Sequence, residues 1–199
     1  MKKAGRPLSF NRQKALEKAM LTFWQSGYET TSITDLTTAM GITAPSLYTA
    51  FGDKKKLFIE AINLYAFGDR GGEDFIANAE TSYDAAQMLL NTSLLIFTDE
   101  KTPAGCLMAS STATGSDTSL EVRQYVSSIR TNMREALTKR IERDIRENKL
   151  PSSVSATALS NYIFAVIQGM SVLARDGLSK FELQQVTNIA MKSWSSSAE

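Results

Sequence analysis

Apolar residues recur every three or four positions along most of the chain, a spacing that predicts helices and offers no candidate strand. The pattern is sharpest over residues 32–51. Ser32 followed by Asp35 has the spacing of a capping box, and Gly41 is expected to end the helix that begins there. That helix carries three apolar residues along one side: Ile33, Leu36 and Met40.

A second short helix is predicted directly after this turn. Thr43 is placed to cap it, and Pro45 falls in its first turn, where a missing N–H is tolerated. Apolar spacing turns three residues inward: Leu47, Tyr48 and Phe51. The residues left to face outward are all small: Thr43, Ala44, Pro45, Ser46, Thr49 and Ala50. Such a helix pair suits the major groove of DNA, although an ordinary helical hairpin has the same spacing.

The same periodicity predicts the other helices. The first is expected from about Ser9 to Ser26, and a later one, capped by Asp53, is interrupted at residues 68–72. Further helices are expected at residues 85–97, 105–114, 119–148, 155–175 and 179–194.

Additional end signals support these later helices. Capping boxes are predicted for two pairs, Thr118 with Glu121 and Ser179 with Glu182, and Gly177 is expected to close the helix over residues 155–175. The arginines of the long helix are expected mostly to face water: Arg123, Arg130, Arg134, Arg140, Arg143 and Arg146.

Composition narrows the class of protein. The 199 residues are 43% hydrophobic with a formal net charge of +1, which predicts a soluble globular protein. The most apolar run, residues 162–174, is broken by Gln168 and Ser171, and no apolar segment follows the N-terminal lysines. A cytoplasmic protein without a membrane partner is therefore expected, and a single cysteine agrees with a reducing compartment.

The absence of histidine weakens most enzyme interpretations. Without it the chain has no Ser-His-Asp or Cys-His nucleophilic site, and with one cysteine it lacks the usual zinc ligands. No Gly-rich phosphate loop occurs either. No catalytic residue, metal site or cofactor is predicted.

Charge is unevenly distributed along the chain. The first 60 residues carry nine Lys or Arg against five acids, a net +4, and the remainder carries −3. Within the predicted arm, residues 1–8, Arg6 is the candidate to enter a minor groove, although a solubilising tail is equally consistent. The lysines at 54, 55 and 56 open a helix, where cations are unfavourable, so they favour bound phosphate over a solvated charge run.

The segment GYETTSITDLTTAMGITAPSLYTAFGDKKKLF resembles the DNA-binding segment of TetR/AcrR-type transcriptional regulators. The resemblance implies an all-α fold, with a helix-turn-helix domain of homeodomain-like type at residues 1–52 and a C-terminal ligand-binding and dimerisation bundle at 53–199. It implies a repressor of double-stranded operator DNA that a small-molecule effector releases. Base edges would be approached by Ala44, Pro45, Ser46 and Thr49, and phosphates by Thr34, Thr43, Tyr48 and Lys54, with Lys55 beside them.

One departure from the family pattern concerns specificity. Many members carry Lys or Arg just before the residue matching Pro45, where this chain has Ala44. The outward face of the second helix therefore cannot make a bidentate Arg–guanine contact. Readout is expected to depend on hydroxyls and apolar contacts, and the operator sequence does not follow from the chain.

The resemblance also implies two sites in the C-terminal part. A homodimer would be formed through the last two helices, by Leu159, Ile163, Val166, Gly169, Met170, Leu183, Val186, Ile189 and Trp194. An effector cavity would be lined among Met88, Phe97, Cys106, Met108, Tyr125, Met133, Tyr162 and Gln168.

Two alternatives remain open at this point. The Gly-Cys-Leu phrase around Cys106 resembles a branch of the family in which some members sense electrophiles through a cysteine, although a buried inert cysteine fits as well. A helical carrier or enzyme built around an apolar pocket is the alternative from another class.

Overall fold

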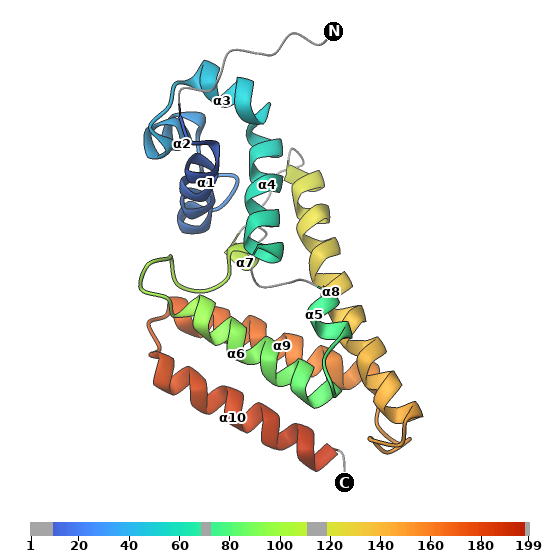
Figure 1. Cartoon of the computed structure of the whole chain (residues 1–199). Coiled ribbons are helices and arrows are strands. Elements are labelled where there is room, and N and C mark those ends of the chain that lie inside the picture. The colour runs from blue at the N-terminus through green and yellow to red at the C-terminus, as the bar shows by residue number, and fades with distance from the viewer. Residues whose placement is uncertain (1–9, 69–72, 111–118, 198–199) are drawn as a thin grey trace, which may run out of the picture.

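The computed structural model describes residues 10–68, 73–110 and 119–197, and its regular structure within those ranges is entirely helical (Figure 1). The helices are α1 (Arg12–Ser26), α2 (Ile33–Met40), α3 (Ala44–Phe51), α4 (Lys54–Phe67), α5 (Glu73–Ala77), α6 (Ser82–Phe97), α7 (Leu107–Ser110), α8 (Leu120–Arg146), α9 (Ala156–Arg175) and α10 (Lys180–Ser197). Helices α1 to α3 form a head at one end of the molecule. The long helices α6, α9 and α10 lie together at the other end, and α4 and α8 run between the two (Figure 1).

Several helix boundaries differ from those expected, because side chains outside the apolar pattern cap the helices. The first helix begins at Arg12 rather than near Ser9, since the Asn11 side chain accepts from the backbone N–H of Lys14. Helix α6 begins at Ser82 because Thr81 caps it. The five-residue helix α5 was not predicted at all.

The capping box expected between Thr118 and Glu121 falls partly outside the described residues. Ser119 occupies the N-cap position and makes no side-chain cap bond, while Thr118 lies outside the described residues. The carboxylate of Glu121 instead pairs with a lysine of α4. By contrast, the box between Ser179 and Glu182 is confirmed by reciprocal hydrogen bonds of 2.8 and 3.3 Å.

The head is held by α1, which packs against both α2 and α4. Phe23, Tyr28 and Phe58 form an aromatic cluster with ring centroids 4.9 to 6.2 Å apart. Leu36 from α2 and Leu47 from α3 are fully buried in the same core. These contacts fix the angle between α2 and α3 from inside the head.

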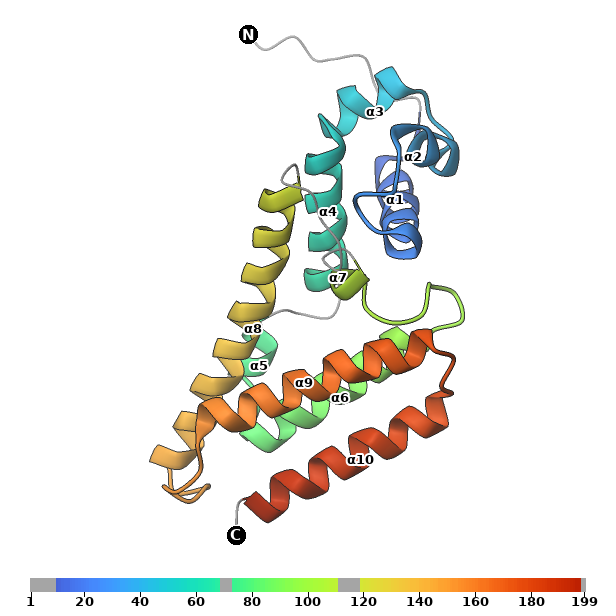
Figure 2. The same cartoon turned by 180° about the vertical axis from the view of Figure 1, so that it is seen from behind.

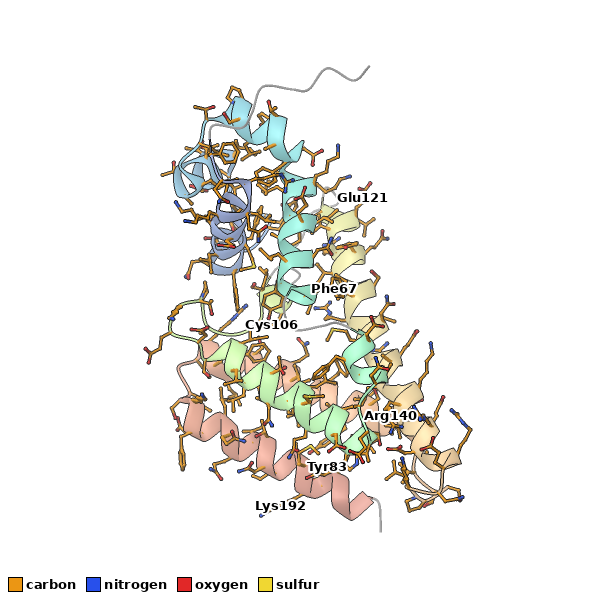
Figure 3. The ribbon with its side chains drawn as sticks, in the orientation of Figure 1. Phe67, Tyr83, Cys106, Glu121, Arg140 and Lys192 are labelled. Atoms are coloured by element: carbon orange, nitrogen blue, oxygen red, sulfur yellow. The ribbon has the colours of Figure 1, made fainter. Side chains whose placement is uncertain are left out.

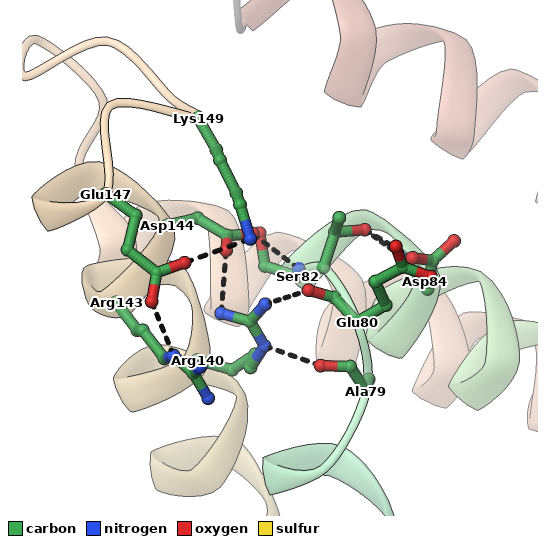
Figure 4. A network of polar contacts seen from close by, with 10 residues as sticks. Ala79, Glu80, Ser82, Asp84, Arg140, Arg143, Asp144, Glu147 and Lys149 are labelled. Carbon is green, nitrogen blue, oxygen red and sulfur yellow. Dashed lines mark hydrogen bonds and ion pairs between the residues drawn. The ribbon is translucent and has the colours of Figure 1, made fainter.

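A buried ion pair ties α8 to the segment between α5 and α6 (Figure 4). Arg140 and Asp144 are 3% and 1% exposed, and their charged groups lie 2.7 Å apart. Arg140 Nε donates to the carbonyl of Ala79 at 3.0 Å, and Asp144 accepts from the backbone N–H of Ser82 at 2.6 Å. The expectation that Arg140 faces water is therefore wrong, because these partners compensate the charge inside the protein.

Helix α9 packs against both α6 and α10, which also pack against each other (Figure 2). By length and mean hydropathy, 1.3, it is the one helix in the described ranges that would suit a membrane span, and 33% of that window is buried. Its far end is closed as expected, since Gly177 has φ +94° and donates to the carbonyl of Ala174. Some apolar residues of α9 therefore pack into the bundle, and others remain exposed to solvent.

Candidate nucleic-acid interface and ligand cavity

Local hydrogen bonds shape the α2–α3 pair. The backbone N–H and the hydroxyl of Ser32 donate to the Asp35 carboxylate at 2.8 and 2.7 Å, which lowers the Asp35 pKa. Gly41 ends α2 in the left-handed conformation, φ +69°, which favours glycine. The Thr43 hydroxyl then caps α3 by accepting from the backbone N–H of Ser46 at 3.4 Å. All three end signals predicted for this pair are confirmed.

The outer surface of the pair presents small polar side chains. Thr34, Thr43, Pro45 and Thr49 are exposed, and Ala44 and Ser46 are half-buried. The Thr49 hydroxyl donates back to the carbonyl of Pro45 at 2.8 Å, so its oxygen keeps acceptor capacity toward an outside donor. The exposed residues at the N-terminal end of α3 and the Thr49 hydroxyl therefore face solvent together.

Tyr48 does not pack inward as its spacing suggested. Its side chain is 49% exposed, while Leu47 and Phe51 on either side of the turn are 0% and 3% exposed. The exposed phenol lies on the same short helix as the other outward residues. This placement agrees with the phosphate-contacting role that the family resemblance implies for Tyr48, and not with the apolar spacing.

Arg12 fixes the end of α3, a role that the sequence pattern did not indicate. Its guanidinium donates two bonds to the Glu60 carboxylate, at 2.7 and 2.8 Å, and two to the carbonyl of Ala50, at 3.1 and 3.3 Å. It also lies 4.3 Å from the centre of the Phe51 ring. A cation at the C-terminal end of α3 is electrostatically favourable, and the clamp joins α1, α3 and α4.

Lys54 is held against the head. Its Nζ lies 4.6 Å from the centre of the Tyr28 ring and donates to the carbonyl of Glu29 at 3.3 Å. Burial lowers the pKa of Lys54, and the nearby carboxylates of Glu29 and Asp35 act in the opposite direction. An ammonium has three donors, so capacity remains for a phosphate at the α4 N-terminus.

The neighbouring lysines have acidic partners. Lys55 forms an ion pair with Glu121 of α8, and this hydrogen bond raises the Lys55 pKa. Lys56 lies 3.7 Å from Asp53. Both pairs are exposed, where ion pairs contribute little stability, so phosphate can compete for either lysine. Arg6, the candidate of the N-terminal arm, lies outside the described residues.

A short segment before α7 joins the head to the C-terminal bundle, and Cys106 marks its position in Figure 3. The indole of Trp24 in α1 donates to the carbonyl of Gly105 at 3.2 Å. On the other side, the Ser171 hydroxyl accepts from the Cys106 backbone N–H at 2.9 Å, and Arg175 donates to its carbonyl at 2.9 Å. Residues 105 and 106 therefore bond to α1 and to α9 together.

A cavity of about 100 Å³ lies behind this segment and is mostly apolar. Five of the residues expected to line an effector site do line it: Phe97, Cys106, Met108, Met133 and Gln168. Met88, Tyr125 and Tyr162 do not: Tyr125 donates to the Asn63 side chain at 2.5 Å, and Tyr162 is 36% exposed. Phe164, also a pocket candidate from the sequence, lines it as well. Nine further lining residues were not predicted: Tyr65, Ala66, Phe75, Leu89, Thr92, Ser93, Ile96, Arg130 and Ile167.

Cys106 forms part of the wall of this cavity. It is 4% exposed, and its Sγ accepts from the Tyr65 hydroxyl at 3.5 Å. A buried thiol of this kind behaves mainly as a small apolar side chain. In the described part of the chain, no three His, Cys, Asp or Glu side chains lie close enough together to hold a metal ion.

The residues expected at a dimer interface divide into two groups. Five are buried in the core of this protomer and cannot form its surface: Leu159, Ile163, Met170, Leu183 and Trp194. Val166 and Val186 are half-buried, while Gly169 and Ile189 are exposed. The large apolar residues exposed on these two helices are Tyr162, Val172, Phe181 and Ile189. The core residues were misassigned because one apolar face of each helix packs inward.

Known proteins resemble this chain along almost its whole length. The HTH-type transcriptional repressor ComR of Escherichia coli K12 is 33% identical over 201 residues, covering 97% of this chain and 93% of ComR. The repressor BdcR of the same organism is 41% identical over 61 residues, 31% of each chain. A cysteine mutant of the TetR family regulator CifR, solved with 26-bp double-strand operator DNA, superposes with a TM-score of 0.85 at 34% identity, covering 94% of this chain and 98% of CifR.

Family models match both parts of the molecule. Residues 15–61 match the model described as bacterial regulatory proteins, tetR family, and residues 85–185 match the tetracyclin repressor-like C-terminal domain. The first range spans the head with most of α4, and the second runs from α6 into α10. On these two matches and the near-complete overlap with ComR, the chain belongs to the TetR family of bacterial regulatory proteins.

Proposed function

We propose that this protein is a DNA-binding transcriptional repressor whose α3 enters the major groove of an operator. The exposed small-residue face of α3, together with Lys54 at the N-terminus of α4, is the observation that carries the proposal. The overlap with CifR, which was solved on operator DNA, supports it. Residues 1–52 would read DNA, and residues 53–199 would bind ligand and partner.

The chemistry of the α3 face defines the kind of readout. Ser46 and Thr49 offer hydroxyls to base edges, and Pro45 and Ala44 offer apolar contact to thymine methyl groups. Thr34, Thr43 and Tyr48 lie beside them for phosphate contacts, which position a protein on the duplex without reading its sequence. We expect an operator whose recognition depends less on guanine than is usual for Arg-bearing helices.

A second copy of the chain would complete the DNA-binding unit. Of the eight large apolar residues exposed in the described ranges, four lie on α9 and α10: Tyr162, Val172, Phe181 and Ile189. Small residues between them, such as Gly169, allow close approach of helices. A two-fold dimer through this face would place two α3 helices on a palindromic operator.

Effector binding would release the operator. The cavity behind Cys106 is the candidate ligand site, and its wall reaches Trp24 of the head through residues 105 and 106. We assign the protein to the cytoplasm and no enzymatic activity to it, in keeping with relatives named as regulators. Neither cysteine sensing nor a carrier role is favoured, since Cys106 is buried and the head has an exposed reading face.

The test is binding to DNA from upstream of the protein's own gene, measured by fluorescence anisotropy across salt concentrations. Each phosphate contact contributes about −0.9 to the slope of log Kobs against log salt, so several contacts per protomer give a steep slope. Lys54→Ala should flatten that slope by about one unit without changing sequence preference. Lys139→Ala, an exposed lysine far along α8, is the matched control.

Substitution of the α3 hydroxyls distinguishes contacts with base edges from contacts with phosphates. Ser46→Ala or Thr49→Ala should change which operator variants bind best while leaving the salt slope unaltered, because base-edge contacts carry the sequence information. A binding equilibrium insensitive to salt would contradict the proposal, as would equal binding to any duplex of the same length.

A further inference from the structure

The wall of the cavity behind Cys106 offers no unused charge to a ligand. Of the described residues that line it, Arg130 is the one with a charged side chain. Its guanidinium is already engaged by the protein, since Nη1 donates to the carbonyl of Met108 at 3.5 Å and Arg130 has a further interaction besides. An ion entering this cavity would therefore lose its hydration without gaining a counter-charge of its own.

Three uncharged polar side chains of the same wall are available to a ligand. Thr92 and Ser93 of α6 and Gln168 of α9 line the cavity, and their side chains make no hydrogen bond to any other described residue. A helical hydroxyl often donates to the carbonyl one turn earlier, as Thr98 does to Leu94 at 2.7 Å. Because the wall hydroxyls lack that bond, each keeps its donor and its acceptor capacity.

The rest of the wall suits a short alkyl group. Leu89, Ile96 and Phe97 contribute apolar surface from the same helix that carries the two hydroxyls. A dry cavity of about 150 Å³ holds benzene, so a cavity of about 100 Å³ accommodates roughly four carbons. A polar group at one end of such a molecule can bond to the wall while its carbons fill the apolar part.

We propose that the cavity behind Cys106 takes a small uncharged molecule, with an apolar body of about four carbons and one hydrogen-bonding group that meets Thr92, Ser93 or Gln168. This inference rests on the proposed function, since it names the ligand class of the proposed effector site. A hydroxyl or carbonyl group on the ligand supplies the missing partner, and a charge on the ligand opposes binding.

Methionine methyl groups provide a readout at the cavity itself. Met108 and Met133 line it, whereas Met40 of α2 and Met191 of α10 do not. The full-length protein, labelled with carbon-13 at its methionine methyl groups, is titrated by NMR without DNA, and each signal is assigned from a Met→Leu variant. Filling of the cavity should shift the signals of Met108 and Met133, with little change in those of Met40 and Met191.

The probes differ from one another in one feature at a time. Butan-1-ol supplies four carbons and a hydroxyl, 1-fluorobutane has the same shape without the donor, butylammonium and butanoate add a charge of either sign, and octan-1-ol exceeds the size. We expect butan-1-ol to bind saturably with a Kd of about 0.1–10 mM, since so few atoms limit the affinity. The fluoride should bind about threefold to tenfold more weakly, and both ions at least tenfold more weakly.

Variants of the polar wall residues locate the hydrogen-bonding group of the ligand. Thr92→Val combined with Ser93→Ala removes both hydroxyls at nearly constant shape, and Gln168→Leu removes the amide. At least one of these two variants should bind butan-1-ol about threefold to tenfold more weakly and 1-fluorobutane no more weakly than the unmodified protein does. Thr98→Val, which loses a hydroxyl of α6 that does not line the cavity, should bind both probes unchanged.

Four outcomes would overturn the inference: no saturable shift of Met108 or Met133 with butan-1-ol, equal binding of 1-fluorobutane or of either ion, tighter binding of octan-1-ol, or unchanged affinity in both wall variants. Operator binding is measured on the same samples by anisotropy, with and without butan-1-ol. Intact operator binding without a butan-1-ol shift defeats this inference alone. Absent operator binding defeats the proposed function, whatever the NMR titration shows. Cavity binding that leaves operator affinity unchanged supports the ligand class and defeats the effector role proposed for the cavity.

Discussion

Hydrogen bonds between a few exposed side chains and their own backbone determine where the reading helices begin. Asp35 illustrates this, because its carboxylate accepts from both the backbone N–H and the hydroxyl of Ser32. The same carboxylate lies at the N-terminal end of α2, where negative charge is favourable. The orientation of α2 beneath α3 therefore depends in part on an ionised group at the surface.

Replacing Asp35 by Asn should lower the Tm at pH 7 by about 2–4 °C, the usual effect of weakening one cap in a chain of this size. The Asp35 pKa is lowered in the folded protein, first by the Ser32 side chain and then by its backbone N–H. A depressed pKa stabilises the fold above the unfolded-state pKa and loses that contribution as the pH falls through the folded value.

The Tm difference between Asp35→Asn and the unmodified protein should therefore shrink as the pH is lowered below about 4. Differential scanning calorimetry from neutral to acidic pH measures it. Glu142→Gln, which alters an exposed carboxylate near the C-terminal end of α8, is the control. A gap that widens on acidification would contradict the argument.

Helices α5, α6 and α8 depend on the buried pair of Arg140 and Asp144 for their mutual position. Both side chains are almost fully buried, and their remaining bonds go to the backbone between α5 and α6. Removing one partner leaves the other charged and buried, so Asp144→Asn or Arg140→Met should destabilise the fold by about 3–5 kcal/mol. Urea unfolding measures the change.

The next ion pair along α8 provides a matched control. Arg143 and Glu147 are also four residues apart, at 2.8 Å, but both are exposed. The Glu147 pKa is lowered to about 2 by hydrogen bonds from Arg143 and Lys149. Because water screens this pair, Arg143→Gln should leave the urea midpoint at neutral pH nearly unchanged. Equal losses in both variants would show that burial is not the cause.

Gly105 lies against the backbone of α9, in the segment that contacts the head. It has φ +79°, and a Cβ there would lie 2.7 Å from the carbonyl oxygen of Ser171 and 2.8 Å from Arg175 Nε. Gly177 shares the positive φ, +94°, but a Cβ there would meet nothing within 4 Å. The two glycines therefore separate steric contact from backbone strain.

Gly177→Ala should cost about 1 kcal/mol from strain alone, and Gly105→Ala clearly more, by about 1–3 kcal/mol, because the backbone of α9 must shift. Urea unfolding of both variants measures the difference. Since Trp24 donates to the Gly105 carbonyl, Gly105→Ala should also weaken operator binding, whereas Gly177→Ala should not. Similar losses in stability would mean that the contact with α9 is relaxed without cost.

Helix positions were predictable because their end signals are local in sequence. The boxes at Ser32 and Ser179, and the glycines at 41 and 177, act within a few residues and were placed correctly. Helix α5 was missed because five residues hold too few periodic positions. The site was less predictable, because its lining converges from α4, α6, α8 and α9.

Residue roles that depend on neighbours distant in sequence could not be read from spacing. The buried Arg140 finds its carbonyl partners about 60 positions earlier in the chain, and Arg12 finds Glu60 at a separation of 48. The side chain of an arginine in an amphipathic helix is expected to be exposed unless such distant partners are known. For the same reason, core residues of α9 and α10 were predicted at the dimer interface.

At the scale of the whole molecule, the exposed apolar side chains of α9 and α10 are the candidate contacts of a dimer. Phe181 and Ile189 are 74% and 63% exposed, and Val172 on the adjacent helix is 58% exposed. Large apolar side chains gathered on two packed helices are typical of a subunit interface. An isologous dimer buries each of them twice, which is why one substitution has a doubled effect.

Ile189→Glu should convert the proposed dimer to a monomer, because it places two carboxylates in or near one apolar contact across the two-fold axis. Sedimentation equilibrium should give twice the chain mass of 21.9 kDa for the unmodified protein and the mass of one chain for Ile189→Glu. Leu120→Glu, which adds the same charge at an exposed leucine of α8, should stay dimeric.

Ile189→Glu should also lose most of its operator affinity, since one α3 reaches only half of a palindrome and the linked second binding event is lost. A monomeric variant that still bound the full operator tightly would mean that each head reads DNA alone, and the exposed face of α9 and α10 would then need another explanation.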